Sequence, residues 1–138
     1  GPDTPIVVVN KAEGRSTLEL FLHHFKLKNS EVKAQVVIGD NPQGIKTVEG
    51  NPASIGYVSI GAAEVAIQQG SQLKLLPMSG VTASTQSLQS GASPLARTLN
   101  LVTRKGARSE LAQRFISFAQ SRDVHDLVEK QYFVPLKK

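Results

Sequence analysis

Cysteine is absent from this sequence of 138 residues, and the absence excludes several kinds of chemistry. A chain without cysteine has no disulfides, no thiolate nucleophile and no cysteine-ligated zinc or iron–sulfur centre. Tryptophan is also absent, and aromatic residues make up only 5% of the chain. No apolar run approaches the roughly 20 residues that a membrane-spanning helix needs.

The remaining composition is that of a single globular domain. Hydrophobic residues make up 40% and charged residues 20% of the chain, which are ordinary values for a folded protein. Sixteen Lys and Arg against eleven Asp and Glu give a net charge of +5, which favours anionic partners without choosing among nucleic acid, a membrane surface and a small oxyanion. Gly1 and Pro2 resemble the scar of a cleaved expression tag, so they are excluded from the fold prediction.

Apolar periodicity predicts short strands alternating with helices, which is typical of an α/β layer fold with a largely parallel sheet. The predicted strands are residues 6–9, 34–38, 53–60, 73–76 and 95–103. The predicted helices are residues 16–26, 41–50, 62–69, 85–89, 109–120 and 123–130.

The segment between the first predicted strand and the first predicted helix is a candidate anion site. It contains Lys11, Gly14, Arg15, Ser16 and Thr17. Open α/β sheets bind ligands where a strand ends and a helix begins, and a helix start offers unpaired N–H groups with partial positive charge. Gly14 would allow close backbone approach, the hydroxyls could donate, and an arginine can hold an oxyanion with two N–H groups.

A purely structural interpretation of the same segment stays open. Ser16 followed by Glu19 fits a capping box, which stabilises a helix start without any ligand. A second glycine-rich segment, at residues 39–47, has the glycine spacing of a phosphate-binding P-loop. Ile45 separates Gly44 from Lys46, and Pro42 removes an N–H that such a loop needs. We interpret that segment as a short helix with Asn41 as its N-cap.

No constellation in the sequence predicts catalysis or a metal site. His23 and His24 are adjacent, so on a helix their side chains diverge and cannot share one metal ion. There is no Gly-x-Ser-x-Gly nucleophile turn, and the glutamates are scattered. Basic residues lie near two loops without interleaved aromatics, so nucleic-acid binding is not expected. The sequence therefore predicts no enzyme, no metal and no cofactor.

Four segments occur in an order that is typical of one protein family. They are Lys-Ala-Glu-Gly-Arg-Ser-Thr at 11–17, Asn-Pro-Ala-Ser-Ile-Gly-Tyr-Val at 51–58, Ser-Pro-Leu-Ala-Arg-Thr-Leu-Asn-Leu-Val at 93–102, and Phe-Val-Pro-Leu at 133–136. Together they resemble the phosphate-binding subunit of bacterial phosphate ABC transporters, within the type II periplasmic solute-binding family. The family counterpart of the first segment is Arg-x-x-Gly-Ser-Gly-Thr.

The resemblance implies a fold: an α/β, three-layer single lobe of a type II periplasmic binding protein. Its sheet would be mostly parallel with one long antiparallel crossover strand, residues 95–103, followed by two C-terminal helices. Residues 3–138 would be the second lobe, with 107–138 as the helices that return to the first lobe in the family. Lys11 falls where the family has its phosphate-binding arginine, so the bidentate fork is lost there. Thr17 matches the family, whereas Arg15 and Ser16 replace Ser and Gly.

The function expected from the resemblance is binding of phosphate or a similar oxyanion by an extracytoplasmic, periplasmic-type protein that performs no covalent chemistry. Contacts would come from the Gly14–Thr17 helix start. The partners would be a membrane permease of an ABC transporter or a sensor protein. The alternative is a ligand-free interaction or sensor lobe that recognises a protein partner or self-associates. Because the last two helices would contact the first lobe in the family, we also expect an exposed apolar patch and a possible homodimer.

Overall fold

The computed structural model describes residues 3–106 and 109–135, and it contains one parallel sheet. The strands are β1 (Val7–Lys11), β2 (Val36–Ile38) and β3 (Ser54–Gly56), in the order β2-β1-β3. Val9 is central, because it pairs with Val36 on one side and with Gly56 on the other. The predictions for Gly1, Pro2 and Leu136 lie outside the described residues.

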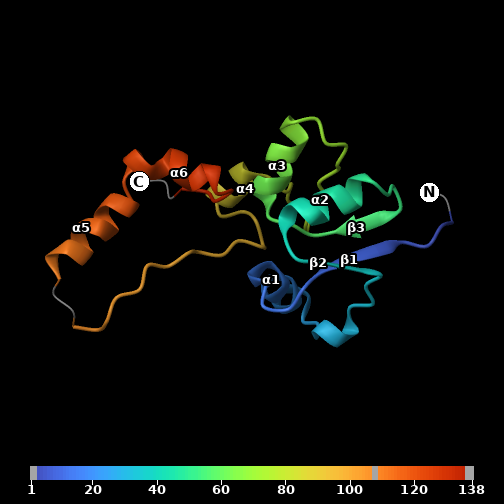
Figure 1. Cartoon of the computed structure of the whole chain (residues 1–138), viewed down its shortest axis with the longest axis horizontal. Helices are drawn as coiled ribbons and strands as arrows, with labels where there is room; N and C mark the ends of the chain where they lie inside the picture. The colour runs from blue at the N-terminus through green and yellow to red at the C-terminus, as the bar shows by residue number, and fades with distance from the viewer. Residues whose placement is uncertain (1–2, 107–108, 136–138) are drawn as a thin grey trace.

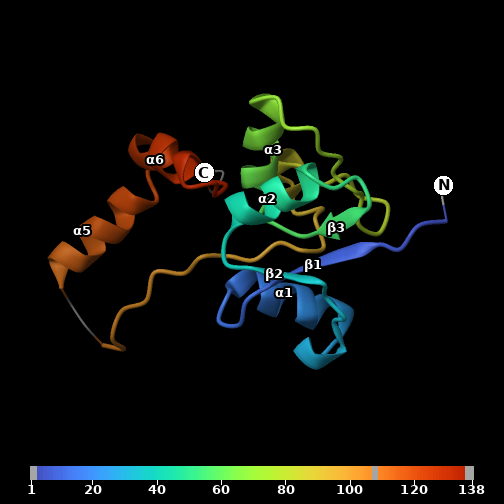
Figure 2. The ribbon, with the colours of Figure 1, turned by 45° about the vertical axis from the view of Figure 1, so that its right-hand side comes forward.

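Helices cover both faces of this sheet, so the predicted three-layer arrangement is confirmed. α1 (Ser16–Phe25) lies on one face, and α2 (Asn41–Glu49) and α3 (Ile60–Gln68) lie on the other (Figures 1 and 2). A parallel sheet that is covered in this way needs apolar residues on both faces, which the β-branched run in β1 supplies. The buried apolar residues are Val9, Leu18, Ile38, Ile45, Ala62, Ala63 and Val124.

Gly44 allows α2 to approach the sheet closely. A Cβ at this position would lie 2.8 Å from Cδ1 of Ile38 and 3.0 Å from Cγ1 of Val58. These distances are shorter than ordinary contacts between carbon atoms, so a larger residue would push the helix away from the sheet. The close approach keeps the start of α2 beside the end of β1.

The remaining described elements are short helices. They are the 3₁₀ helices η1 (Asn29–Glu31) and η2 (Arg122–Val124), with α4 (Thr85–Gln89), α5 (Glu110–Ala119) and α6 (His125–Lys130). Figure 1 shows α5 and α6 beyond α4, away from the sheet. The chain then turns back, since the N–H of Phe133 donates to the carbonyl of Val128 (3.2 Å). The end of the described chain therefore packs back on α6.

Two predicted strands are wrong. Residues 73–76 and 95–103 are not strands, and residues 94–106 make no backbone–backbone hydrogen bond within the described ranges. The physical reason for the second error is the lack of a partner, because a strand forms only where its backbone groups are paired. Leu99, Leu101 and Val102 are accordingly exposed. The predicted long antiparallel crossover strand is therefore an unpaired extended segment here.

Boundaries differ in smaller ways. The predicted strand at 53–60 is shorter, because Ile60 already begins α3. The helix predicted at 41–50 has Asp40 as its N-cap and not Asn41, since the N–H of Gln43 donates to the Asp40 carboxylate (2.8 Å). The extra residue before the helix leaves the Asn41 side chain free for other contacts.

The expected apolar patch on the C-terminal helices is confirmed. On α5, Leu111, Phe115 and Phe118 are 76%, 62% and 53% exposed, and Leu127 on α6 is 56% exposed. None of the residues of α5 is buried. A helix with one strongly apolar face ordinarily packs that face against protein, so this surface is the least satisfied part of the described fold.

Candidate anion site at the carboxyl edge of the sheet

The three strands end at one edge of the sheet, and each is followed by a helix. β1 ends at Lys11, β2 at Ile38 and β3 at Gly56, and the pairing is parallel throughout. The starts of α1, α2 and α3 therefore gather at this carboxyl edge. That edge is where open α/β sheets bind ligands, and each helix start adds partial positive charge.

The start of α1 is open. Its N-cap is Arg15, in an extended conformation and without a side-chain cap hydrogen bond. The carbonyl of Arg15 accepts from the N–H groups of Leu18 (2.9 Å) and Glu19 (3.3 Å). Within the described ranges, the N–H groups of Ser16 and Thr17 have no hydrogen-bond acceptor. These are the two amides that a bound anion could use.

The predicted capping box is wrong. Ser16 is the first helical residue and not the N-cap, so the Ser16–Glu19 pair does not close the helix start. The helix begins one residue earlier than a Ser16 N-cap would place it, after a turn at Gly14, whose φ of +77° is readily adopted only by glycine. Gly14, Arg15 and Ser16 are exposed, and Thr17 is half-buried.

The other two helix starts are less available. Asp40 already caps α2 with its own carboxylate, which would repel an anion. The first turn of α3 is covered by the end of the chain, since a Cβ on Gly61 would lie 2.8 Å from the carbonyl oxygen of Tyr132. Of the three, α1 alone combines free amides with exposure.

Arg15 lies over the neighbouring loop. Its Nη2 atom is 3.7 Å from the point that a Cβ on Gly39 would occupy, and Gly39 directly follows β2. The guanidinium group therefore reaches from the start of α1 toward the start of α2. An exposed guanidinium beside free amides can hold an oxyanion with two N–H groups.

The predicted site residue Lys11 is buried. The residue is only 3% exposed, and its ammonium donates to Oδ1 of Asn41 (2.8 Å). Burial lowers the pKa of Lys11, the Asp40 carboxylate raises it, and the charge of Arg15 lowers it. The Lys11 ammonium therefore lies beside the start of α2, near enough to Arg15 for the two positive charges to interact.

Sequence reasoning missed the polar residues that support the loop after β1. Tyr57 donates its hydroxyl proton to Oδ1 of the buried Asn10 (2.5 Å), and the same hydroxyl accepts from the N–H of Lys11 (3.3 Å). The ring of Tyr57 stacks on Phe21 of α1 with 4.2 Å between centroids. Burial raises the pKa of Tyr57, and the hydrogen bond from Lys11 opposes that rise.

A second supporting contact keeps an acidic side chain occupied. Nδ2 of Asn10 donates to Oδ1 of Asn29 (3.1 Å), and Nδ2 of Asn29 donates to the Glu13 carboxylate (3.0 Å). Glu13 is thereby tied to η1. Asn41 and Ser59 were missed as site residues as well, although each lies three residues after the end of a strand, and that position was the signal that could have found them.

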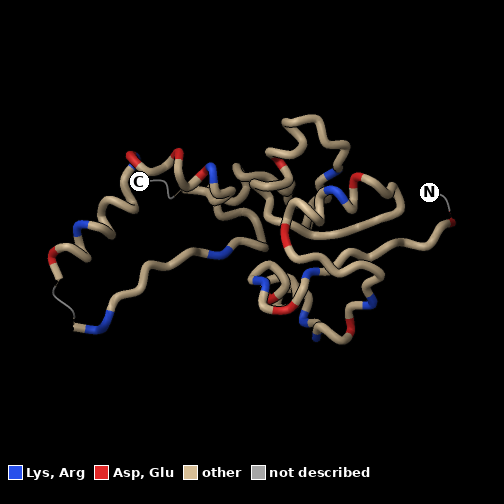
Figure 3. Tube along the Cα trace, viewed as in Figure 1, with Lys and Arg blue, Asp and Glu red and all other residues tan. Residues whose placement is uncertain are grey.

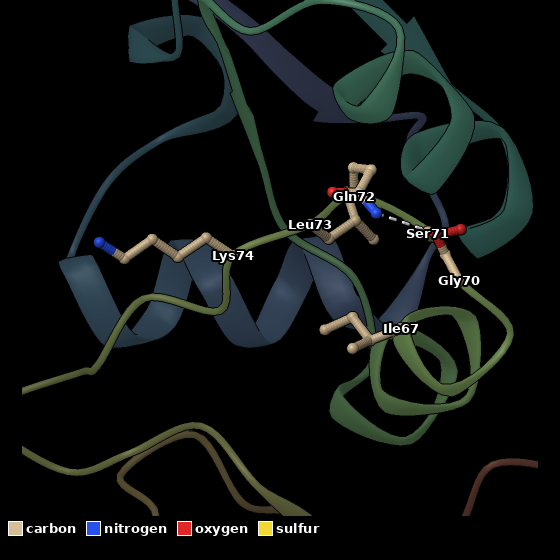
Figure 4. A pocket seen from close by; sticks show the side chains of 6 residues that line it. All are labelled: Ile67, Gly70, Ser71, Gln72, Leu73 and Lys74. Carbon is tan, nitrogen blue, oxygen red and sulfur yellow. Dashed lines mark hydrogen bonds between the residues drawn. The ribbon is translucent and has the colours of Figure 1, made fainter.

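The hollow in Figure 4 is unrelated to this edge. It is lined by Ile67, Gly70, Ser71, Gln72, Leu73 and Lys74. The N–H of Gln72 donates to Glu49 at the end of α2 (3.0 Å), so this hollow lies where α2 and α3 end. Since both helices begin at the carboxyl edge, the hollow belongs to the opposite edge of the sheet.

The charged side chains of the described residues form no second candidate site. Figure 3 shows Lys and Arg spread along the chain and interspersed with Asp and Glu. Among residues 3–106 and 109–135, no group of three or more His, Cys, Asp or Glu side chains is placed to hold a metal ion. In the same ranges, no helix is both long and apolar enough to cross a membrane.

Comparison with known proteins decides the family. The model of the PBP superfamily domain matches residues 1–123. The chain belongs to the PBP superfamily. This result confirms the resemblance that the four sequence segments carry.

The relatives of this PBP superfamily chain are named as phosphate-binding proteins. It is 29% identical to the phosphate-binding protein PstS 2 of Streptococcus agalactiae over 95% of this chain and 46% of that protein. It is 26% identical to the phosphate-binding protein PstS of Borreliella burgdorferi over 99% of this chain and 51% of that protein. The chain thus spans about half the length of the curated relatives it matches.

Solved structures agree on the fold. The crystal structure of PstS from Borrelia burgdorferi matches with a TM-score of 0.70 and 26% identity, over 99% of this chain and 55% of that one. An ABC-type phosphate transport receptor from Vibrio cholerae matches with a TM-score of 0.76 and 20% identity, over the same shares. The α/β lobe of a periplasmic binding protein is therefore the fold of this chain.

The contacts of Tyr57 lead to a prediction about stability. Tyr57→Phe leaves the buried Asn10 oxygen without its donor, so the free energy of unfolding should fall by about 1–3 kcal/mol at neutral pH. The folded state holds the Tyr57 pKa above 10.0, so the proton-linked part of this difference is present below pH 10 and is lost as the pH rises through the raised pKa. Urea unfolding of both proteins across this range measures the difference, and equal stabilities at neutral pH would contradict the assignment.

Proposed function

We propose that this chain binds inorganic phosphate as part of the solute-binding protein of an ABC-type phosphate transporter. The observation that carries the proposal is the open start of α1, where the N–H groups of Ser16 and Thr17 are free beside the exposed Arg15. The names of the relatives support phosphate as the ligand. Other oxyanions of the same charge would compete for the same donors.

Each site residue has a separate part in this proposal. Gly14 allows the chain to turn so that the next amides face outward, and Ser16 and Thr17 supply those amides and their hydroxyls. Arg15 grips the anion from the exposed side. Lys11 contributes its charge from the buried side, through Asn41, and does not supply the bidentate contact.

The proposal includes the setting of the protein. The chain would act outside the cytoplasm, deliver its ligand to a membrane permease or report it to a sensor protein, and carry out no covalent step. Residues 3–138 would form one lobe of a two-lobed binding protein, and 107–138 would return to the other lobe. Half a site implies weak affinity, because the second lobe would add donors and exclude water.

The phosphate proposal predicts a specific loss in Arg15→Ala. Removing a charge-assisted, two-point contact should weaken phosphate binding about tenfold or more, as measured by calorimetry at low salt. Lys74→Ala is the matched control, because it removes one positive charge at the opposite edge of the sheet. The proposal fails if both variants lose the same affinity, since binding would then depend on net charge alone.

We also propose that the apolar face of α5 pairs with a second copy when no other lobe covers it. Phe115 is 62% exposed at the middle of that face. Phe115→Glu should shift the chain toward the monomer in light scattering at high concentration, by about tenfold or more in dissociation constant. Gln113→Glu adds the same charge at another exposed position of α5 and should leave association unchanged. A wild-type chain that stays monomeric at high concentration would refute the pairing.

A further inference from the structure

Lys11 is turned into the protein, although it is the first residue of the candidate site. It is 3% exposed, whereas Arg15, four residues later, is exposed. The N–H of the next residue, Ala12, donates to the carbonyl of Ile38 (2.9 Å), which ties the beginning of the loop to β2. The beginning of the loop that leads to α1 is therefore fixed at the sheet, and the Lys11 side chain is held in the interior.

Asn41 is the residue that holds this ammonium. Its Oδ1 atom accepts from Nζ of Lys11 (2.8 Å) and from the N–H of Ser59 (3.4 Å). Its Nδ2 atom donates to Oγ of Ser59 (2.9 Å). One side-chain amide thus connects the end of β1, the start of α2 and the start of α3. The amide is suited to this place because it both donates and accepts, which a carboxylate cannot do.

We propose that Asn41 is a positioning residue of the phosphate site, acting through Lys11 and Ser59. The inference rests on the proposed function and adds to it a residue that touches no ligand. Asn41 keeps the buried charge of Lys11 in a fixed place at the carboxyl edge of the sheet, near the charge of Arg15. A charge held in place beforehand attracts an anion without the cost of ordering a lysine side chain at the moment of binding.

The groups around Lys11 make the proposed role of Asn41 visible in the pH dependence of phosphate binding. Asp40 and Arg15 act on its charge from the loops before α2 and α1, and the Tyr57 hydroxyl accepts from its backbone N–H. The oxygen of Asn41 stabilises the charged form of Lys11 through the hydrogen bond. Loss of Asn41 therefore makes Lys11 release its proton at a lower pH.

The experiment compares Asn41→Ala with the wild-type chain by phosphate calorimetry across the alkaline pH range. We expect about tenfold weaker binding near neutral pH, because a hydrogen bond to a charged group is lost. We also expect the alkaline fall in affinity to begin at a lower pH in Asn41→Ala, which a residue with a merely structural role would not cause. Gln68→Ala, an exposed change on α3, is the control and should match the wild type.

Two further variants keep the test decisive if Asn41→Ala does not fold. Ser59→Ala removes the hydrogen bond that Ser59 accepts from Asn41 and should weaken phosphate binding by about threefold. Ser59→Thr keeps the hydroxyl and should bind phosphate as the wild type does. Wild-type affinity and an unshifted pH profile in Asn41→Ala, or equal affinities of Ser59→Ala and Ser59→Thr, would overturn the inference and leave phosphate binding intact. Absence of phosphate binding in the wild-type chain would instead refute the proposed function, and the inference with it.

Discussion

Parallel pairing of β1 with both of its neighbours is the constraint on which the rest of this structure depends. Because β2 and β3 flank β1 in the same direction, all three strands deliver their following loops to one edge. Helix starts, the buried Lys11 ammonium and the Asn41 amide meet there as a consequence. If one of the strands ran antiparallel to the others, its following loop would lie at the opposite edge of the sheet. These groups would then be divided between two edges, and the anion site would not form.

The candidate site has exposed residues at the start of α1 and buried hydrogen bonds underneath the loop that precedes this helix. Arg15 and Ser16 are exposed and Thr17 is half-buried, and the amides of Ser16 and Thr17 have no hydrogen-bond acceptor among the described residues. Below, Tyr57 and Asn10 hold the loop by hydrogen bonds that are partly or fully buried. Two acidic side chains nearby are occupied, since Asp40 caps α2 and Glu13 accepts from Asn29, while Glu19 in the first turn of α1 makes no bond to the free amides. Electrostatic attraction at the start of α1 is therefore not cancelled by a carboxylate bonded to the same amides.

Sequence patterns predicted the half of the chain whose interactions are local or made with close neighbours. The β-branched run of β1, the apolar face of α1 and the proline near the start of α2 all lead to the observed elements. They did not predict the exact cap of α1, because Ser16 and Arg15 compete for that position and the turn at Gly14 decides between them. Tyr57, Asn41 and Ser59 reach the site across 18 to 47 residues of sequence, so their contacts required the fold.

The strand predicted at residues 95–103 is wrong for a different reason. Their alternation of apolar residues is that of a strand, but a strand also needs a backbone to pair with, and none of the described residues provides one. Leu99 and Val102 on this segment and Phe115 on α5 are exposed together in the C-terminal half. The same half of the chain is the one that the proposed two-lobed arrangement would cover.

The central claim is that the amides at the start of α1 bind a small oxyanion. Two-dimensional ¹H–¹⁵N NMR during a phosphate titration at moderate salt tests it most directly. The account predicts saturable shifts that are largest at the amides of Ser16 and Thr17, with little change at α2 amides beyond the Asp40 cap. Uniform shifts over all exposed basic segments, or unchanged Ser16 and Thr17 signals under saturating phosphate, would contradict it.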